Sequence, residues 1–149
     1  LSFLSGNPVP VRYERQRRIL IDGMRDAHFY FGSKKVCIAL EPDMAVQTSR
    51  WISEMGAEVT LAAIPQNTES LENIIAKEVV VSDLFSIDGD YDLLISNSHA
   101  EDTVKRLGVP LYQTGFPVYK VIGNSSRITI GYRGTLAIIN DAANLLIAE

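Results

Sequence analysis

The chain of 149 residues contains only one cysteine and two histidines, so it has few of the side chains that bind transition metals. One cysteine cannot form an internal disulfide, and it cannot supply the several thiolates that hold an iron–sulfur cluster. Cys37 lies within the apolar run 36–40 (VCIAL), which is typical of a buried strand. The histidines, His28 and His99, lie far apart and show no metal-site spacing. We therefore expect no metal ligand in this chain.

The sequence also lacks long apolar runs and a strong charge of either sign. No stretch is apolar over the length of a bilayer span, and the first residues do not follow the pattern of a secretory signal. A net charge of −4 gives no electrostatic reason to expect nucleic acid or a membrane as a partner. We expect a cytoplasmic protein. Because the chain begins at Leu1, we also expect it to be a piece of a longer one.

Hydrophobic periodicity and glycine positions predict alternating helices and strands. Residues 1–10 read as a linker, and a long helix follows over 11–31, with Leu20, Met24, Ala27 and Phe31 on one stripe. Strands are expected over 36–40, 58–64, 79–81, 92–96 and 109–112, and helices over 43–55, 68–76, 99–107 and 134–148, with Asp43 and Ser98 as helix caps. The predicted fold is α/β: a Rossmann-like, mostly parallel sheet of about five strands with helices on both faces, in a single domain over 11–149.

The ordinary motifs of nucleotide binding and nucleophilic catalysis are missing. A nucleotide-binding domain has glycines after its first strand, where phosphate approaches a helix amino terminus. Here Glu41, Pro42 and Asp43 stand at that point, and two carboxylates repel a phosphate. There is also no P-loop and no glycine-x-serine-x-glycine elbow. The sequence predicts that ATP and NAD do not bind in the usual manner, and it indicates no catalytic residue.

Three polar segments follow apolar runs and form the candidate site. Segments that leave the carboxyl ends of parallel strands converge on one sheet edge, where sites are built. The candidate cofactor-binding or interface residues are Asn97, Ser98, His99, Gly115, Phe116, Pro117, Gly131, Tyr132, Arg133 and Gly134.

The residues alone leave several roles open for these segments. His99 is an exposed first-turn residue, a metal or cluster contact, or a hydrogen-bonding group at an interface. Arg133 can hold a carboxylate or another anion, while its neighbours Gly131 and Gly134 indicate close backbone packing. Phe116 and Pro117 form either a rigid turn or an apolar contact for a partner.

The ordered series of these motifs resembles the carboxyl-terminal domain of the nitrogenase component 1 superfamily. The resemblance covers nearly the whole chain and is strongest to the β-type subunit of the scaffold on which the iron–molybdenum cofactor is assembled. It rests on residues 91–98 (YDLLISNS), 109–111 (VPL), 115–117 (GFP) and 131–134 (GYRG), and on 9–10 (VP), 15–18 (RQRR), 26–29 (DAHF), 41–43 (EPD) and 97–99 (NSH).

The resemblance implies a function for a larger complex. In the superfamily, clusters lie between domains or between paired subunits, so an iron–sulfur cluster and an iron–molybdenum cofactor precursor are implied for the full complex. Implied partners are a homologous α-type scaffold subunit (NifE-like), in a heterotetramer, and the nitrogenase iron protein. The alternatives are the equivalent domain of a nitrogenase or protochlorophyllide reductase β subunit, and a free-standing α/β ligand-binding module.

Overall fold

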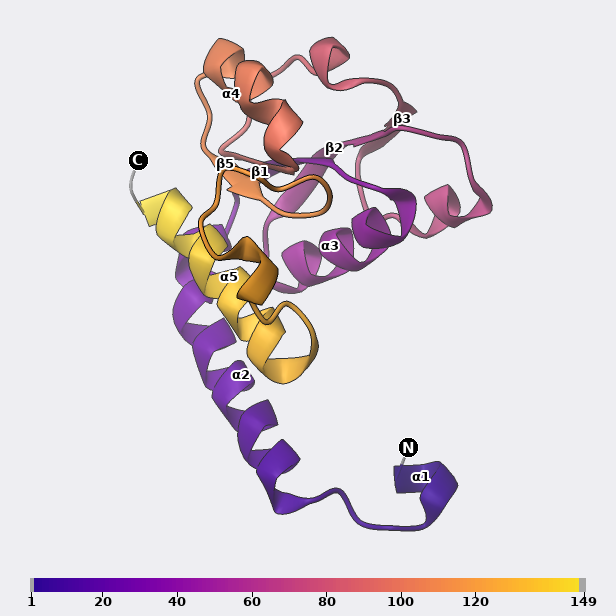
Figure 1. Cartoon of the computed structure of the whole chain (residues 1–149), viewed down its shortest axis with the longest axis vertical. Coiled ribbons are helices and arrows are strands. Elements are labelled where there is room, and N and C mark those ends of the chain that lie inside the picture. The colour runs from indigo at the N-terminus through magenta and orange to yellow at the C-terminus, as the bar shows by residue number, and fades with distance from the viewer. Residues whose placement is uncertain (1, 148–149) are drawn as a thin grey trace.

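The computed structural model describes residues 2–147, which form a five-stranded parallel sheet with helices on both faces (Figure 1). The strand order is β3-β2-β1-β4-β5. The strands are β1 (Lys35–Ala39), β2 (Glu58–Ile64), β3 (Glu78–Val81), β4 (Leu93–Ser96) and β5 (Leu111–Gln113). The helices are α1 (Ser2–Ser5), α2 (Val11–Phe31), α3 (Pro42–Glu54), α4 (Glu101–Leu107) and α5 (Gly131–Ile147), with short 3-10 helices η1 (Glu69–Asn73), η2 (Leu84–Ser86), η3 (Ser98–Ala100) and η4 (Asn124–Ser126). The predicted fold class is confirmed.

The larger core lies between the sheet and helices α2, α3 and α5. Figure 1 shows these three helices on one side of the sheet and α4 on the other. Side chains of a strand alternate between faces, so Val36 and Ile38 point into the larger core, while Cys37 belongs to the cluster beneath α4. Burial raises the pKa of the Cys37 thiol to about 12.

Helices α2 and α5 lie side by side along most of their length (Figure 1). The predicted stripe of α2 is confirmed, because Ala27 and Phe31 are buried and Leu20 and Met24 pack against the core. A small residue allows the close approach of the two helices. A Cβ at Gly23 would lie 2.2 Å from Leu136 Cδ1 of α5, so a larger residue there requires the Leu136 side chain to move.

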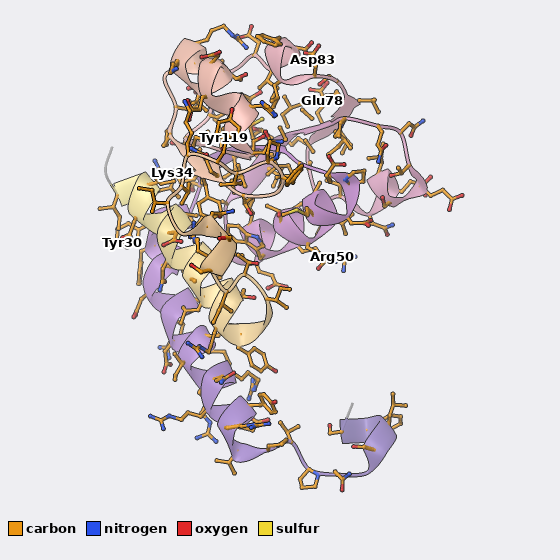
Figure 2. The ribbon with its side chains drawn as sticks, in the orientation of Figure 1. Tyr30, Lys34, Arg50, Glu78, Asp83 and Tyr119 are labelled. Atoms are coloured by element: carbon orange, nitrogen blue, oxygen red, sulfur yellow. The ribbon has the colours of Figure 1, made fainter. Side chains whose placement is uncertain are left out.

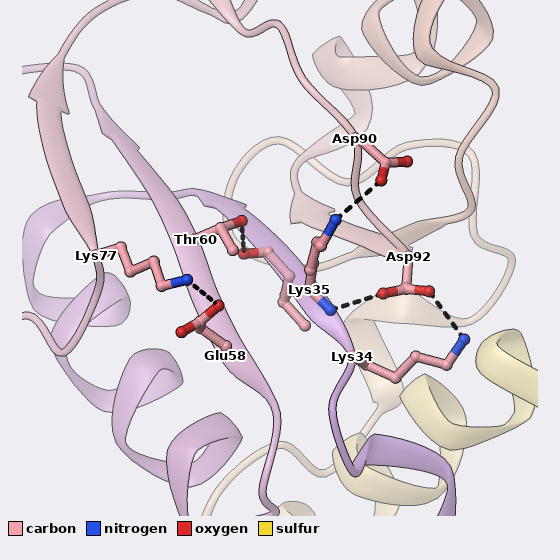
Figure 3. Close-up of polar contacts among 8 residues, drawn as sticks. Lys34, Lys35, Glu58, Thr60, Lys77, Asp90 and Asp92 are labelled. Atoms are coloured by element: carbon pink, nitrogen blue, oxygen red, sulfur yellow. Dashed lines mark hydrogen bonds and ion pairs between the residues drawn. The ribbon is translucent and has the colours of Figure 1, made fainter.

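Ionic contacts join the amino-terminal ends of neighbouring strands in two pairs, β1 with β4 and β2 with β3 (Figure 3). Lys34 Nζ lies 2.9 Å from Asp92 Oδ1, and the backbone N–H of Lys35 donates to Asp92 Oδ2 at 2.6 Å. Lys77 Nζ lies 2.7 Å from Glu58 Oε2 across β2 and β3. These contacts are at the opposite end of the strands from the candidate site, so they serve the alignment of the sheet.

Several predicted details differ from the structure. The expected linker contains the short helix α1. The segment 68–76 forms only the five-residue η1, since it buries a single side chain, Ile74, at its end. Asp43 does not cap α3, which begins at Pro42 with Glu41 as a cap that makes no side-chain bond. The last helix begins at Gly131 rather than Gly134, and its predicted end at Ala148 lies outside the described residues.

Among residues 2–147, no helix is both long and apolar enough to cross a membrane.

Candidate functional site

The order in which strands are added to the sheet changes side between β1 and β4. A crevice lies at this switch point. β1 is followed in sequence by β2 on one side, whereas β4 and β5 lie on the other, so the connections after β1 and β4 diverge. A hollow of about 280 Å³ lies at the carboxyl ends of the strands. We call it the switch-point crevice. Its lining comes from every strand exit: Ala39, Leu40, Glu41, Ala63, Pro65, Ser82, Asp83, Leu84, Phe85, Asn97, Gly115 and Phe116.

Two of the three predicted segments meet beside this crevice. Asn97 Nδ2 donates to the carbonyl of Phe116 at 3.0 Å, and the N–H of Ser98 donates to the carbonyl of Pro117 at 2.9 Å. The turn after β4 therefore holds the connection after β5 directly. Within that connection Gly115 has φ +80°, a conformation that favours glycine. The Phe116–Pro117 peptide bond is cis.

Ser98 fixes the connection after β5 rather than capping a helix, which corrects the prediction. Its side chain is buried, and its hydroxyl donates to Gln113 Oε1 at 2.6 Å and accepts from the N–H of Tyr119 at 3.1 Å. The cap belongs to Asn97, whose Oδ1 accepts from the N–H of His99 at 3.0 Å. Asparagine and serine are both common helix caps, and here the bonds of Ser98 to the connection after β5 leave that role to Asn97.

His99 is exposed and packs edge-on against an aromatic ring. Its ring centroid lies 5.9 Å from that of Tyr119, which is 60% exposed and labelled in Figure 2. The neighbouring Lys120 forms an ion pair with Glu101 of α4. His99 thus lies at the surface and packs on the connection after β5, and its role stays a prediction.

The third predicted segment lies elsewhere. Gly131 to Gly134 form the first turn of α5, and Tyr132 and Arg133 line a separate shallow groove with Gln16 and Ile19 of α2. Gly134 must be a glycine, because a Cβ there would lie 2.3 Å from the carbonyl carbon of Thr129. The predicted close backbone packing is thus confirmed for Gly134. The sequence placed this segment at the strand-exit edge because it follows an apolar run, but that run, 128–130, is not a strand.

Carboxylates dominate the charge of the switch-point crevice. Glu41 and Asp83 are the two charged lining residues, and Asp43 follows in the first turn of α3. Hydrogen bonds from the hydroxyl and then the N–H of Ser86 hold the pKa of Asp83 below its ordinary value. We therefore still expect phosphate to be repelled at this point.

The sequence analysis missed the segment after β3, which supplies Asp83 and Phe85. A signal was present, since aspartate is a preferred cap at the start of a helical turn. That turn follows the apolar run 79–81, so its exit joins the same edge as the others.

Within residues 2–147, no group of three or more His, Cys, Asp or Glu side chains is placed to hold a metal ion. Cys37 is buried beneath α4 with a raised pKa, and His28 lies against Gly56 at the far end of α2. These residues do not fit a metal-cluster site, so we assign no cluster chemistry to them.

Comparison with known proteins gives consistent matches over the whole chain. The family model described as nitrogenase component 1 type oxidoreductase matches residues 1–147. Proteins named "nitrogenase iron-molybdenum cofactor biosynthesis protein NifN" are similar throughout: that of Bradyrhizobium diazoefficiens is 43% identical, covering 100% of this chain and 33% of its own length. Those of a Nostoc species and of Klebsiella pneumoniae are 39% and 31% identical over 99% and 98% of this chain, and 34% and 33% of their own lengths.

A solved structure of nitrogenase Cp1 at pH 6.5 matches with a TM-score of 0.91 and 26% identity. The match covers 99% of this chain and 36% of that one. The chain thus spans about a third of the length of the curated relatives it matches. The position of that third within a full-length subunit stays a prediction.

Proposed function

Since the chain belongs to the family of nitrogenase component 1 type oxidoreductases, we propose that it is one domain of a scaffold subunit on which an iron–molybdenum cofactor precursor matures. The observation that supports this most is the identity of 31–43%, over nearly all of the chain, to proteins named for that biosynthesis. In this proposal the chain contributes a rigid α/β body and its exposed strand exits, while cluster ligands come from other parts of the complex.

The proposed partner is a homologous α-type subunit, NifE-like, in a heterotetramer that also meets the nitrogenase iron protein. Exposed aromatic and aliphatic side chains on the connection after β5 support contact with other protein. Phe116, Ile122 and Ile130 are 84%, 103% and 85% exposed. Several fully exposed apolar side chains on one connection support a surface that is covered in an assembly.

A chimera tests the scaffold role. The segment of the Bradyrhizobium diazoefficiens protein that matches this chain is replaced by residues 1–149, and the chimera is purified with its α-type partner. The expected result is a stable complex that restores activity to cofactor-deficient nitrogenase. A complex that forms but does not restore activity contradicts the scaffold role.

The same complex separates the scaffold from the reductase alternative. We expect no reduction of acetylene or protochlorophyllide above the background of the reductase partner alone. Turnover of either substrate would assign the chain to a reductase subunit. The Bradyrhizobium diazoefficiens protein with its own segment, purified with the same partner, is the matched control in both assays.

A further inference from the structure

Two phenylalanines flank the switch-point crevice and are open to solvent. Phe85 of η2 is 80% exposed and Phe116 of the connection after β5 is 84% exposed, and both line the hollow. They come from opposite sides of the switch point, since η2 follows β3 and the other connection follows β5. An exposed pair of large aromatic side chains at the mouth of a hollow is typical of a binding surface.

The charge of the same crevice is negative. Glu41 and Asp83 both line it, and none of the lining residues is basic. Within residues 2–147 no ion pair engages either carboxylate, and Asp83 Oδ1 accepts hydrogen bonds from the N–H and the hydroxyl of Ser86, both at 2.9 Å. Both carboxylates therefore remain available to a cation from outside.

The size of the crevice is compatible with a single side chain. Its volume of about 280 Å³ is at the lower limit for small-molecule sites, which span roughly 300–1,000 Å³. Such a hollow suits a single extended side chain anchored by another polypeptide.

We propose that the switch-point crevice binds an arginine side chain presented by a segment of another protein. The guanidinium stacks on phenylalanine rings and pairs with carboxylates through its planar fork of donors. A lysine ammonium carries the charge but stacks less well and donates no fork, and an aliphatic side chain leaves Glu41 and Asp83 unpaired. The complementary charges and the two rings thus select arginine, whether or not the chain serves as a scaffold.

The walls of the crevice are already held in place. Asn97 Nδ2 bonds the carbonyl of Phe116, and the N–H of Thr114 donates to the carbonyl of Ser96 at 2.8 Å. Ser86 fixes Asp83 on the opposite wall. A prepared site loses little conformational entropy when it binds, which raises its affinity.

NMR tests whether the crevice binds arginine. The isotopically labelled chain is titrated with short peptides, and its chemical shifts are followed. The probes are three capped peptides, Gly-Arg-Gly, Gly-Lys-Gly and Gly-Leu-Gly. The arginine peptide is expected to give saturable shifts with a Kd of about 1–10 mM, centred on residues 83–85, 97 and 115–116. The lysine and leucine peptides are expected to bind at least fivefold more weakly.

Variants locate the binding. Glu41→Gln with Asp83→Asn, and separately Phe116→Ala, are expected to weaken binding of the arginine peptide at least fivefold. Asparagine at 83 can still cap η2, and Phe116 is exposed, so both variants keep the fold. The matched control, Glu69→Gln with Glu72→Gln, makes the same change in net charge away from the crevice and is expected to leave Kd unchanged. Absence of saturable shifts up to 50 mM, equal binding of the three peptides, or an unaltered Kd in the crevice variants would overturn the proposal.

Discussion

Replacement of Ser98 by alanine is expected to release the connection after β5 and to destabilise the fold. The Ser98 hydroxyl joins Gln113 Oε1 at 2.6 Å to the N–H of Tyr119 at 3.1 Å, and the residue is 1% exposed. Each lost hydrogen bond costs about 1 kcal/mol when its partner remains partly buried. The free energy of unfolding should therefore fall by about 2 kcal/mol.

Thermal unfolding measures this loss. For a chain of this size, 1 kcal/mol corresponds to roughly 3 °C in Tm, so Ser98→Ala is expected to lower Tm by about 6 °C. The matched control is Ser126→Ala, whose exposed hydroxyl makes one bond, to the carbonyl of Gly123 at 2.9 Å. Water replaces that bond, so the control should change stability by less than about 0.5 kcal/mol.

Hydrogen exchange separates this role from helix capping. If Ser98 fixes the connection, amides of residues 114–119 lose protection in the variant while those of α4 keep theirs. If Ser98 were a helix cap, the loss would appear at the start of α4 instead. A Tm within 1.5 °C of the unaltered protein, or a loss of protection confined to α4, would refute the reasoning.

Three further outcomes follow from the charges and burial of single residues. Cys37, with a pKa of about 12, should react with a thiol reagent only after denaturation, and rapid labelling of the native chain would contradict its burial. Burial alone would raise the pKa of Asp92, but its bonds to the Lys34 ammonium and the Lys35 N–H outweigh this and lower it. Its stabilising effect is therefore present above pH 4 and lost as pH falls through the lowered pKa, so Asp92→Asn should cost about 1 kcal/mol at pH 7 in urea unfolding and progressively less in acid. Because Glu41 stands where a phosphate would lie, calorimetry should detect no binding of ATP or NAD, and micromolar affinity would contradict this.

The sequence carries enough periodicity to predict most of the sheet and its long helices. Both ends of α2 were predicted at the observed residues, since Pro8 and Pro10 precede the helix and Gly32 follows its apolar stripe. β2 was likewise predicted at its observed bounds. The helix predicted over 68–76 was wrong. The few apolar residues of this segment pack on α3 over a single short turn, and a segment that short gains little from helical hydrogen bonds.

The candidate site was predicted only in part, because tertiary contacts that the sequence does not record determine it. Asn97 and Phe116 were correctly assigned to the same edge of the sheet, at the carboxyl ends of the strands, since they follow β4 and β5. Arg133 was assigned there by the same rule, but residues 128–130 lead directly into α5, with the backbone of Thr129 close against Gly134. The bond between Ser98 and Gln113 joins segments 15 residues apart, and no local pattern marks it.

The chemistry of the switch-point crevice depends on more than the sign of its charge. Glu41→Gln removes one carboxylate, yet it should not create a phosphate site. Pro42 is the first residue of α3 and has no N–H to donate, and no glycine follows β1 to let a phosphate approach the backbone. The same substitution should nevertheless weaken the binding of an arginine side chain, because that binding requires the carboxylate itself. A chain that gained nucleotide affinity from this single change would show that charge alone had kept phosphate out, and the backbone argument would fail.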